Sequence, residues 1–592
     1  MPLPSIPSHP SDPTSSRMTV DRYEIASSWL QRFSTFLSSC DAQRAAACLH
    51  EQGFLRDILT LTWSNRTLCG RAKIAAYLRA SLHKSSIHDV KLDVQPHLTP
   101  EFTEATSTVA SGFTFETAVG PGAGYFFLNP TASGDWYAMS VFITLQEIRG
   151  HEESGAEEGV YGGHTLSWTD IALERRLKIE QDPHVLIIGG GQTGLNIGAR
   201  FKQMNISALI VEKNARVGDN WRERYPTLTL HSFKRQAELM YQPYPANWPV
   251  FTPRDKLAQW LEQYSQSDDL VVWTKSRPLP APIYDPVSKR WTVIIDRDGR
   301  HVTIHPVHIV IAAGTLGAPL IPPVRDPERF RGITLHAGYY HGGAPFAGKR
   351  VIVVGAGNSA ADICQDVTFH GGNVTMVQRS STCVVSAANA RRQMEQLWPA
   401  NAPTAVGDFK LNAIPLLMMK RILSAREKES WEAEKETHKG LREAGMKLNM
   451  GPDGSGAYPL MFERFGGFWL DVGCAKLIRE GKVKVKQGVE VARFTEHSVV
   501  FTDGSSLPAD VVIYATSYQS IRDNMRALFS DEVIDQTDPL WGVDEEGEIR
   551  GCYRASGHPG LWFGAGNFAV SRFYSKQLAL EIKAIELGLY KV

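Results

Sequence analysis

The sequence predicts an α/β protein in which a small α+β domain precedes two parallel sheets. Two short apolar runs, residues 185–188 and 350–354, each end in a glycine-rich turn that leads into a helical segment. Short, wholly apolar strands are typical of parallel sheets, which are buried on both faces. In the first 150 residues, helical apolar spacing is followed by alternating β patterns. That order indicates a separate α+β unit.

Composition limits the classes of function. The chain has 592 residues, 43% of them hydrophobic, which is enough for more than one domain. Lys+Arg and Asp+Glu both number 63, so charge gives no reason to expect nucleic acid or an anionic membrane as a partner. The seven cysteines form no C-x-x-C pair, which favours reduced thiols and a cytoplasmic protein over disulfides or a metal site. No stretch approaches the roughly 18 consecutive apolar residues of a membrane span.

The N-terminal region divides into three parts by pattern. Residues 1–18 are rich in Pro and Ser and are expected to be a disordered lead-in. Residues 19–150 are expected to form the α+β domain, with helices at 21–38, 42–49 and 70–82, a strand at 55–63 and later alternating strands. Residues 151–180 are expected to form a linker, because 151–168 are Glu- and Gly-rich and show no hydrophobic period.

The first glycine turn has the features of a dinucleotide-binding motif. Gly189 permits the tight turn, Gly191 lets the backbone approach a pyrophosphate, and Gly194 lets the helix pack closely on the strand. The helix begins with Gln192 and Thr193, and its positive end faces the phosphates. The next strand, 208–211, ends in Glu212, an acid suited to a ribose hydroxyl.

The second turn repeats this Rossmann-like motif with a different closing charge. Gly355 and Gly357 are followed by Asn358, Ser359 and Ala360, with alanine at the permitted third position. The next strand, 374–378, ends in Arg379, whose guanidinium can grip a 2′-phosphate that a carboxylate would repel.

These two turns imply two cofactors in two domains. FAD in the first and NADPH in the second is the economical assignment. It predicts an FAD-binding domain from residues 181–344 and 500–592 and an NADPH-binding domain from 345–499. Disulfide reductases share this layout, but they need a reactive cysteine pair near the flavin, which this chain lacks.

Motifs between and after the turns resemble a known family. The string F-R-G-I-T-L-H-A-G-Y-Y at 330–340 resembles the F-x-G-x-x-x-H-x-x-x-Y fingerprint of class B flavin-containing monooxygenases, and its Tyr340 favours the N- and S-oxygenating branch over the Baeyer–Villiger branch. Further similarities are E-x5-G-D-x-W at 212–221, A-A-G at 312–314 and Y-A-T-S-Y at 514–518, where Ser517 replaces the usual Gly. Residues 470–474 and 560–574 are similar to the plant auxin-forming members and their fungal relatives, so the resemblance covers about residues 180–590.

The resemblance implies a reaction and further cofactor contacts. NADPH reduces FAD, and O2 then forms a C4a-(hydro)peroxyflavin that oxygenates a small lipophilic substrate at nitrogen or sulfur, or oxidises a carbonyl or 2-oxo acid. His231 stands where many members have an Asn that contacts flavin and nicotinamide, so it is the candidate catalytic residue, with cofactor positioning as an equal alternative. His336 is assigned to structure and inter-domain closure. The added cofactor contacts are Lys213, Asn220, Trp221, Gly314, Thr516 and Asn567.

The N-terminal domain carries a second resemblance and an alternative function. Its element order and its L-x5-L-T-W-x3-T-x2-G run ending at Gly70 resemble the cone-shaped fold of ketosteroid isomerase and nuclear transport factor. Such a cone can hold a ligand with Asp57 as general base, although a structural carboxylate and a dimerising or lid role are favoured. The alternative to a monooxygenase is therefore an NADPH oxidase, or a ligand-binding or isomerase protein whose N-terminal domain carries the function.

Substrate selectivity is expected in two segments. Residues 381–468 should roof the flavin, and the aromatic stretch 241–251 should lie nearby. The charged segment 420–439 is expected to be one solvated helix. The expected partners are a small-molecule substrate and O2, and the sequence leaves a homodimer open.

Overall fold

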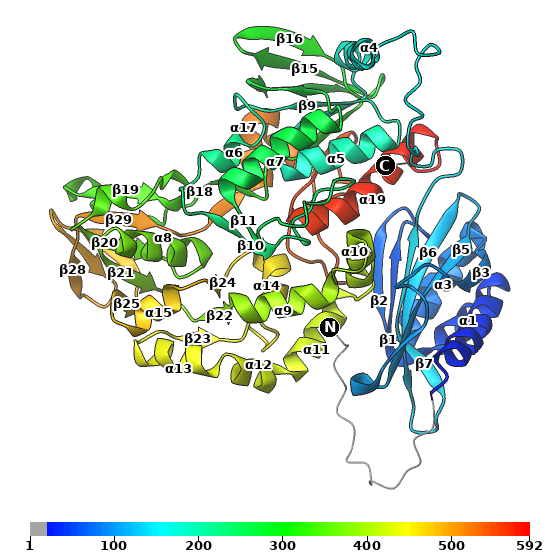
Figure 1. The fold of residues 1–592 in the computed structure, drawn as a ribbon, viewed down its shortest axis with the longest axis horizontal. Helices are drawn as coiled ribbons and strands as arrows, with labels where there is room; N and C mark the ends of the chain where they lie inside the picture. The colour runs from blue at the N-terminus through cyan, green and yellow to red at the C-terminus, as the bar shows by residue number, and fades with distance from the viewer. Residues whose placement is uncertain (1–19, 592) are drawn as a thin grey trace.

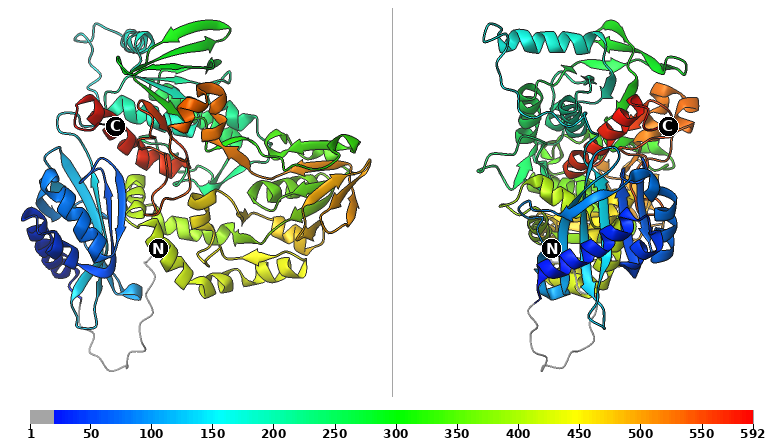
Figure 2. Two further views of the ribbon diagram at one scale, coloured as in Figure 1. Left: turned by 180° about the vertical axis from the view of Figure 1, so that it is seen from behind. Right: turned by 90° about the vertical axis from the view of Figure 1, so that its right-hand side faces the viewer.

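The computed structural model describes residues 20–591. The lead-in predicted for residues 1–18 lies outside this range. An N-terminal α+β unit packs beside a larger part that contains two parallel sheets (Figures 1 and 2). Within the described range, no helix combines the length and the apolarity that crossing a bilayer requires.

The N-terminal unit consists of three helices on one face of a seven-stranded sheet. Its helices are α1 (Arg22–Ser38), α2 (Ala42–Ala47) and α3 (Arg71–Ser85). The strand order is β2-β1-β7-β6-β5-β3, and β4 pairs with β5. The strands are β1 (Leu49–Ile58), β2 (Asn65–Cys69), β3 (His88–Leu92), β4 (Glu101–Thr103), β5 (Thr108–Glu116), β6 (Pro121–Pro130) and β7 (Trp136–Leu145). The predicted helices are present, whereas the strand expected at 55–63 ends at Ile58, where a turn begins.

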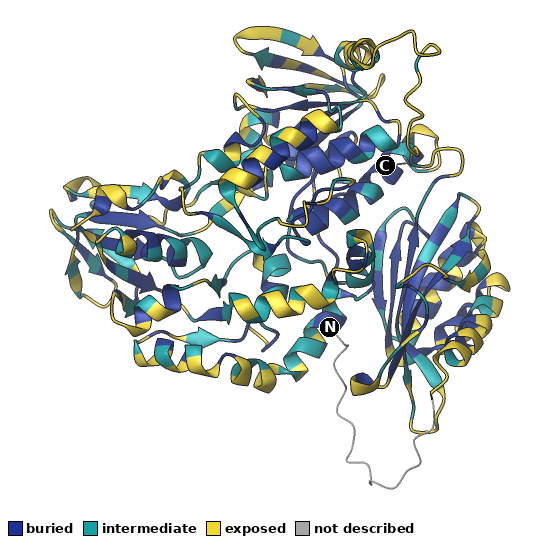
Figure 3. Ribbon diagram, in the orientation of Figure 1, coloured by how far each residue is buried: buried dark blue, intermediate teal, exposed yellow. Residues whose placement is uncertain are grey.

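The sheet of this unit is buried on both faces. On the helical face, Trp29 and Phe33 of α1 pack with Phe126. On the opposite face, Phe142 packs on Phe409 and Phe573 of the larger part. Figure 3 shows much of the central strands as buried, while much of the outer helical surface is exposed. Burial of apolar area on both faces ties the unit firmly to the rest of the chain.

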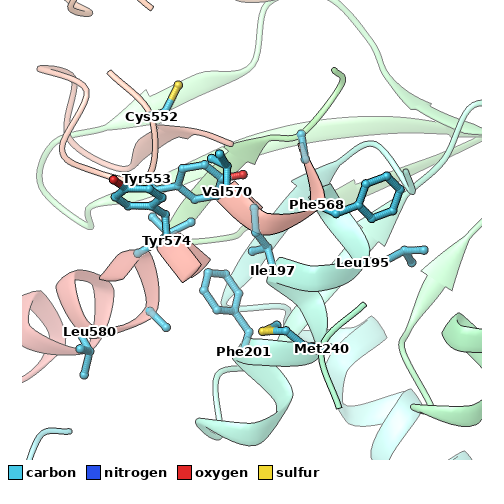
Figure 4. Close-up of a cluster of buried hydrophobic side chains, with 14 of the residues drawn as sticks. Leu195, Ile197, Phe201, Met240, Cys552, Tyr553, Phe568, Val570, Tyr574 and Leu580 are labelled. Carbon is cyan, nitrogen blue, oxygen red and sulfur yellow. The ribbon is translucent and has the colours of Figure 1, made fainter. Parts of the chain in front are cut away.

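The first parallel sheet has the strand order β12-β9-β8-β17-β31. Its strands are β8 (Val185–Ile188), β9 (Ala208–Val211), β12 (Val272–Trp273), β17 (His308–Ile311) and β31 (Leu561–Phe563). Helix α5 (Gln192–Gln203) packs against α19 (Phe568–Glu586), and Figure 4 shows Ile197 and Phe201 of α5 near Tyr574 of α19. The Asn196 amide also donates to the Ser571 hydroxyl at 2.7 Å. The last helix of the chain therefore supports the first glycine turn.

The second parallel sheet has the strand order β19-β29-β20-β21-β25. Its strands are β19 (Ile333–His336), β20 (Arg350–Val354), β21 (Asn373–Gln378), β25 (Val483–Gln487) and β29 (Val511–Tyr514), and helix α8 (Asn358–Phe369) follows β20. Strands β19 and β29 lie outside the range 345–499 that the sequence analysis assigned to this domain, because parallel pairing recruits them from both sides. Together the two sheets confirm the predicted α/β class.

Several connecting segments differ from expectation. The expected linker 151–180 contains helix α4 (Trp168–Gln181), none of whose residues is buried. The expected single charged helix at 420–439 is three helices, α11 (Leu416–Ala425), α12 (Glu427–Ala433) and α13 (Lys435–Glu443). Strands β15 (Arg290–Arg297) and β16 (Arg300–Ile304) form an antiparallel hairpin.

Candidate active site

The first glycine turn is crowded at two of its glycines and open at the third. Gly189 has a φ of +114°, and a Cβ there would lie 2.5 Å from the Ala312 carbonyl oxygen. A Cβ on Gly194 would lie 1.9 Å from the Gly189 carbonyl oxygen. At Gly191, by contrast, the nearest atom to a Cβ is the Asn220 side-chain nitrogen at 3.5 Å. Two glycines are therefore required by packing, and the third opens the turn to a ligand phosphate.

Glu212 lies at the edge of this turn. Its carboxylate is buried and accepts hydrogen bonds from the backbone N–H groups of Gly190 and Asn214, both at 2.9 Å. Nearby, the Trp221 indole N–H is buried without a hydrogen-bond partner among the described residues. A buried donor without a partner is uncommon in a protein. The local donors and acceptors therefore fit a bound polar group, and the exposed side chains of Lys213 and Asn220 border the same turn.

The remaining residues expected at the first cofactor gather at one edge of the first sheet. Gly314 follows β17 with a φ of +105°, and the next residue, Thr315, accepts a hydrogen bond from the Gly566 N–H at 2.8 Å. Asn567 caps α19 by accepting from the Val570 N–H at 3.0 Å. In open parallel sheets, ligands bind at the carboxyl ends of the strands. Helices α5, which begins with Gln192 and Thr193, and α19 both present their N-termini there.

The second turn repeats the geometry of the first. Gly355 has a φ of +129°, and a Cβ there would lie 2.3 Å from the Ala515 carbonyl oxygen. At Gly357 the nearest atom to a Cβ is the Phe468 carbonyl oxygen at 3.8 Å. Asn358, Ser359 and Ala360 form the first turn of α8. Both turns therefore have the crowded first glycine and the open second glycine of a phosphate-binding loop.

Arg379 follows β21 on the surface. Its side chain is 74% exposed, and its guanidinium lies 3.2 Å from the Glu490 carboxylate. An exposed ion pair of this kind is weak and can exchange partners. The guanidinium is therefore accessible to a phosphate on a ligand of the second turn.

The Y-A-T-S-Y segment lies at the carboxyl end of β29 in the second sheet. The Thr516 hydroxyl donates to the Leu320 carbonyl at 2.7 Å, so the structure gives it a backbone partner. Ser517 has a φ of +70°, the left-handed conformation that glycine adopts most readily. This conformation explains why the family motif has Gly here. Ser517 adopts the same left-handed conformation, so the turn is present in this chain.

His231 connects the two cofactor-binding domains. It lies in β10 (Thr229–Phe233), which comes from the first domain, and its Nδ1 is 3.1 Å from the Asn358 side-chain oxygen at the start of α8. Its Nε2 is 3.7 Å from the Asp362 carboxylate, which also accepts a 2.5 Å hydrogen bond from the Tyr225 hydroxyl. Burial acts to lower the pKa of His231, but hydrogen bonding and attraction to Asp362 outweigh burial, so the pKa is raised. The imidazole, which comes from a segment that follows the first turn, is therefore held against the second turn at the start of α8.

Sequence reasoning missed Asp362 and Tyr225. A signal for Asp362 existed, because it lies four residues after Asn358 on the same helix and therefore on the same face. Tyr225 offered no such signal, since its partner lies 137 residues later in the chain.

His336 has a structural environment. Its Nδ1 accepts from the Gly338 N–H at 3.0 Å, which leaves Nε2 to donate to the Ser517 carbonyl oxygen at 3.1 Å. Burial lowers its pKa, so the neutral form is favoured. These contacts join β19 to the turn after β29.

The Asp362→Asn variant is expected to lower the pKa of His231, because the amide removes the negative charge that favours the imidazolium. In the unaltered protein, the raised pKa contributes stability that is fully present below the ordinary histidine pKa of 6.5 and is lost as pH rises through the folded-state pKa. The variant should therefore lose stability near pH 5.5 and change less near pH 8.5. Urea unfolding at both pH values and NMR titration of ¹³C-labelled histidine, assigned with His231→Gln, measure this. An unchanged titration midpoint would contradict the assigned pairing.

A cavity adjoins the first sheet at the start of α19. Its interior volume is about 60 Å³, and Asn567, Val570 and Tyr574 line one side. Trp398 and Met419, from the segment 381–468 in which selectivity was predicted, line another. Residues of the other predicted selectivity segment, 241–251, do not line it.

Two parallel sheets, each with a glycine-rich turn at the end of a strand, define the α/β class of proteins that hold two dinucleotides. Residues 183–525 match the family of flavin-binding monooxygenase-like proteins. This match spans more than half of the chain, and the chain belongs to that family. The predicted flavin-dependent monooxygenase is confirmed, and the family description itself names flavin binding.

Individual relatives agree with the family. The chain is 28% identical over 341 residues to indole-3-pyruvate monooxygenase YUCCA1 of Oryza sativa subsp. japonica, covering 57% of this chain and 77% of the relative. It is 25% identical over 398 residues to probable indole-3-pyruvate monooxygenase YUCCA9 of Arabidopsis thaliana, covering 67% and 85%. A cyclohexanone monooxygenase with bound epsilon-caprolactone aligns with a TM-score of 0.51 and 16% identity, covering 69% of this chain and 89% of that one. At that identity the structural likeness supports the fold alone.

Proposed function

We propose that the protein binds FAD at the first turn and NADPH at the second, and inserts one oxygen atom into a small lipophilic substrate. Substrate, NADPH, a proton and O2 then give oxygenated substrate, NADP⁺ and water. The observation that carries the proposal is the pair of phosphate-binding turns with opposite closing charges, Glu212 and Arg379, in a chain of the flavin-binding monooxygenase-like family. A structural neighbour with a TM-score of 0.50 and 17% identity is an oxidized steroid monooxygenase bound to NADP.

The chain's own residues would hold the first cofactor through backbone and helix ends. Open space at Gly191 admits the pyrophosphate, and Glu212 supports the ribose end of the turn. Asn567 places the N-terminus of α19 toward the same edge, where its positive end favours electron-rich oxygen atoms.

The second turn would hold NADPH in a similar way. Gly357 leaves space for the pyrophosphate beside the first turn of α8. Arg379 exchanges its exposed Glu490 partner for the 2′-phosphate, with which a guanidinium forms paired hydrogen bonds.

The protein's chemical task is then positioning and exclusion of water. Bound FAD supplies hydride acceptance and oxygen activation. His231, held by Asn358 and Asp362, can keep a proton on its imidazole beside the second turn, and this supports its proposed role in catalysis or cofactor positioning. The apolar walls around the cavity keep the reaction away from bulk water.

The N-terminal unit is proposed to be a structural partner of the flavin part rather than an isomerase. Its helices and sheet resemble the ketosteroid isomerase cone in order, but Asp57 is fully engaged. The carboxylate accepts from the N–H groups of Thr60 and Leu61 at 2.9 and 3.0 Å and from the Tyr77 hydroxyl at 2.6 Å. Burial raises the pKa of Asp57 to about 6. A carboxylate with three donors supports the turn that ends β1 and is poorly placed to remove a proton from a ligand.

A cytoplasmic location is part of the same proposal. The cysteines among the described residues are all free thiols, five of them buried. Free thiols suit a reducing compartment.

The decisive test measures reduction and oxygen use by the holoenzyme. NADPH should reduce the flavin anaerobically much faster than NADH. With O2 and an accepted substrate, the NADPH consumed should match the product formed. Stoichiometric release of hydrogen peroxide in the presence of every accepted ligand would favour an NADPH oxidase instead.

A further inference from the structure

The cavity beside α19 includes a residue from the N-terminal unit. Arg56 of β1 is 6% exposed and lines the cavity together with Glu548, which is 2% exposed. The Arg56 Nε and Nη2 atoms donate to the two Glu548 carboxylate oxygens at 2.7 and 2.8 Å. Burial opposes the charge of each group, but their mutual attraction outweighs it and holds the pKa of Glu548 below its usual value.

Arg56 also joins separate segments of the cavity wall. Its Nη2 donates to the Tyr574 hydroxyl of α19 at 2.7 Å, and its Nη1 donates to the Asn412 carbonyl at the end of α10 (Thr404–Asn412). Glu548 in turn accepts from the Thr67 hydroxyl of β2 at 2.6 Å. One buried ion pair therefore ties two strands of the N-terminal unit to three segments that line the cavity.

The charge of the cavity lining is balanced. Among the described residues that line the cavity, only Arg56 and Glu548 carry a formal charge, and they are paired with each other. The rest of the wall is largely apolar and aromatic, including Trp398, Tyr458 and Phe462. A ligand carboxylate placed here would either remain unpaired or displace Glu548, and both outcomes are unfavourable in a desolvated site.

We propose that this cavity is the substrate site, that the N-terminal unit completes it through Arg56, and that it selects uncharged aromatic-sized substrates over anionic ones. This inference rests on the proposed function and deepens it, because it assigns the substrate class. Arg56 and Glu548 are positioning residues that set selectivity through neutralised charge. The rice relative is named for a 2-oxo acid, indole-3-pyruvate. The carboxylate of such a substrate would find no unpaired cation among the described residues that line this cavity.

A matched pair of sulfur compounds tests the substrate class in the full-length holoenzyme. Methyl phenyl sulfide is neutral, and 4-(methylthio)benzoate adds one carboxylate to the same reacting group. We expect the unaltered enzyme to bind the neutral sulfide at least about tenfold more tightly than the carboxylate. The affinity for each compound is measured from the change in the flavin spectrum on binding, so the ratio of the two affinities is defined even when turnover is slow. It is compared with the ratio of kcat/KM for sulfoxide formation.

The Glu548→Gln variant tests the role of the pair. It leaves Arg56 as an uncompensated cation in the lining, so preference for the neutral sulfide should fall by about tenfold or reverse. The matched control is Glu546→Gln, because Glu546 pairs with Arg66 at 2.7 Å at the same interface but lies outside the cavity lining. That control should leave the ratio unchanged.

A second variant tests the same inference if Glu548→Gln does not fold. Leu416→Lys keeps the ion pair and adds an ammonium group to the cavity wall, and it should also raise the relative affinity for the carboxylate. Preference of the unaltered enzyme for the carboxylate, no binding of either sulfide, or an unchanged ratio in both variants would overturn the inference. The proposed function fails separately, if NADPH does not reduce the flavin.

Discussion

The Gly191→Val variant is expected to be folded but to lack flavin. Gly191 has a φ of −82°, which any residue adopts, and the nearest atom to a Cβ is 3.5 Å away. The added side chain therefore fits the protein but fills the space of the pyrophosphate, which needs close approach of the backbone. The ratio of flavin to protein absorbance should fall by about tenfold or more, because the phosphate contacts are charge-assisted. Circular dichroism should match that of the unaltered chain.

The matched control is Gly357→Val in the second turn. A Cβ there is also free of contacts under 3.8 Å, so the fold should again be kept. This variant should retain flavin and lose saturation by NADPH. Normal flavin content in Gly191→Val, or loss of flavin in Gly357→Val alone, would reverse the assignment of the two turns.

The Arg379→Ala variant is expected to lose discrimination between NADPH and NADH. A hydrogen bond to a charged group contributes about 1.5–3 kcal/mol, which corresponds to a roughly 10- to 100-fold rise in KM for NADPH. The KM for NADH and the flavin content should stay the same, because neither involves the 2′-phosphate. Stopped-flow reduction with both nucleotides measures the ratio.

Arg331→Ala provides the control for general surface charge. Arg331 is 72% exposed and lies near Glu496, so its setting is similar to that of Arg379 beside Glu490. It should leave the preference for NADPH unaltered. Equal effects of the two substitutions would show that Arg379 acts through net charge rather than through a phosphate contact.

The parts of this protein that could be predicted from its sequence are those governed by local backbone geometry. Gly189 and Gly355 both have positive φ values at strand ends, and only a glycine-rich signature meets that demand. The closing residues Glu212 and Arg379 follow their strands directly, so their positions could be counted along the chain. The α1 helix was predictable because Trp29 and Phe33 recur on one buried face.

Features that depend on distant partners or on the absence of burial were not predictable. Helix α4 has no buried residue, so no apolar period indicated it. Strands β19 and β29 join the second sheet by parallel pairing with strands far away in the sequence. The sheet therefore extends beyond the predicted range 345–499. Asp362 and Arg56 are ordinary charged residues in the sequence, and only the folded chain brings them to His231 and Glu548.

Arg56 contacts residues that are synthesised long after it. Glu548 and Tyr574 lie 492 and 518 residues after Arg56. At a translation rate of about 5–20 residues per second, the first domain emerges roughly half a minute or more before its partners exist. Until Phe409 and Phe573 are synthesised, Phe142 lacks these two packing partners, and exposed apolar surface of this kind favours binding by chaperones. The Arg56 contacts that join the N-terminal unit to α19 can therefore form only after residue 574 has been synthesised.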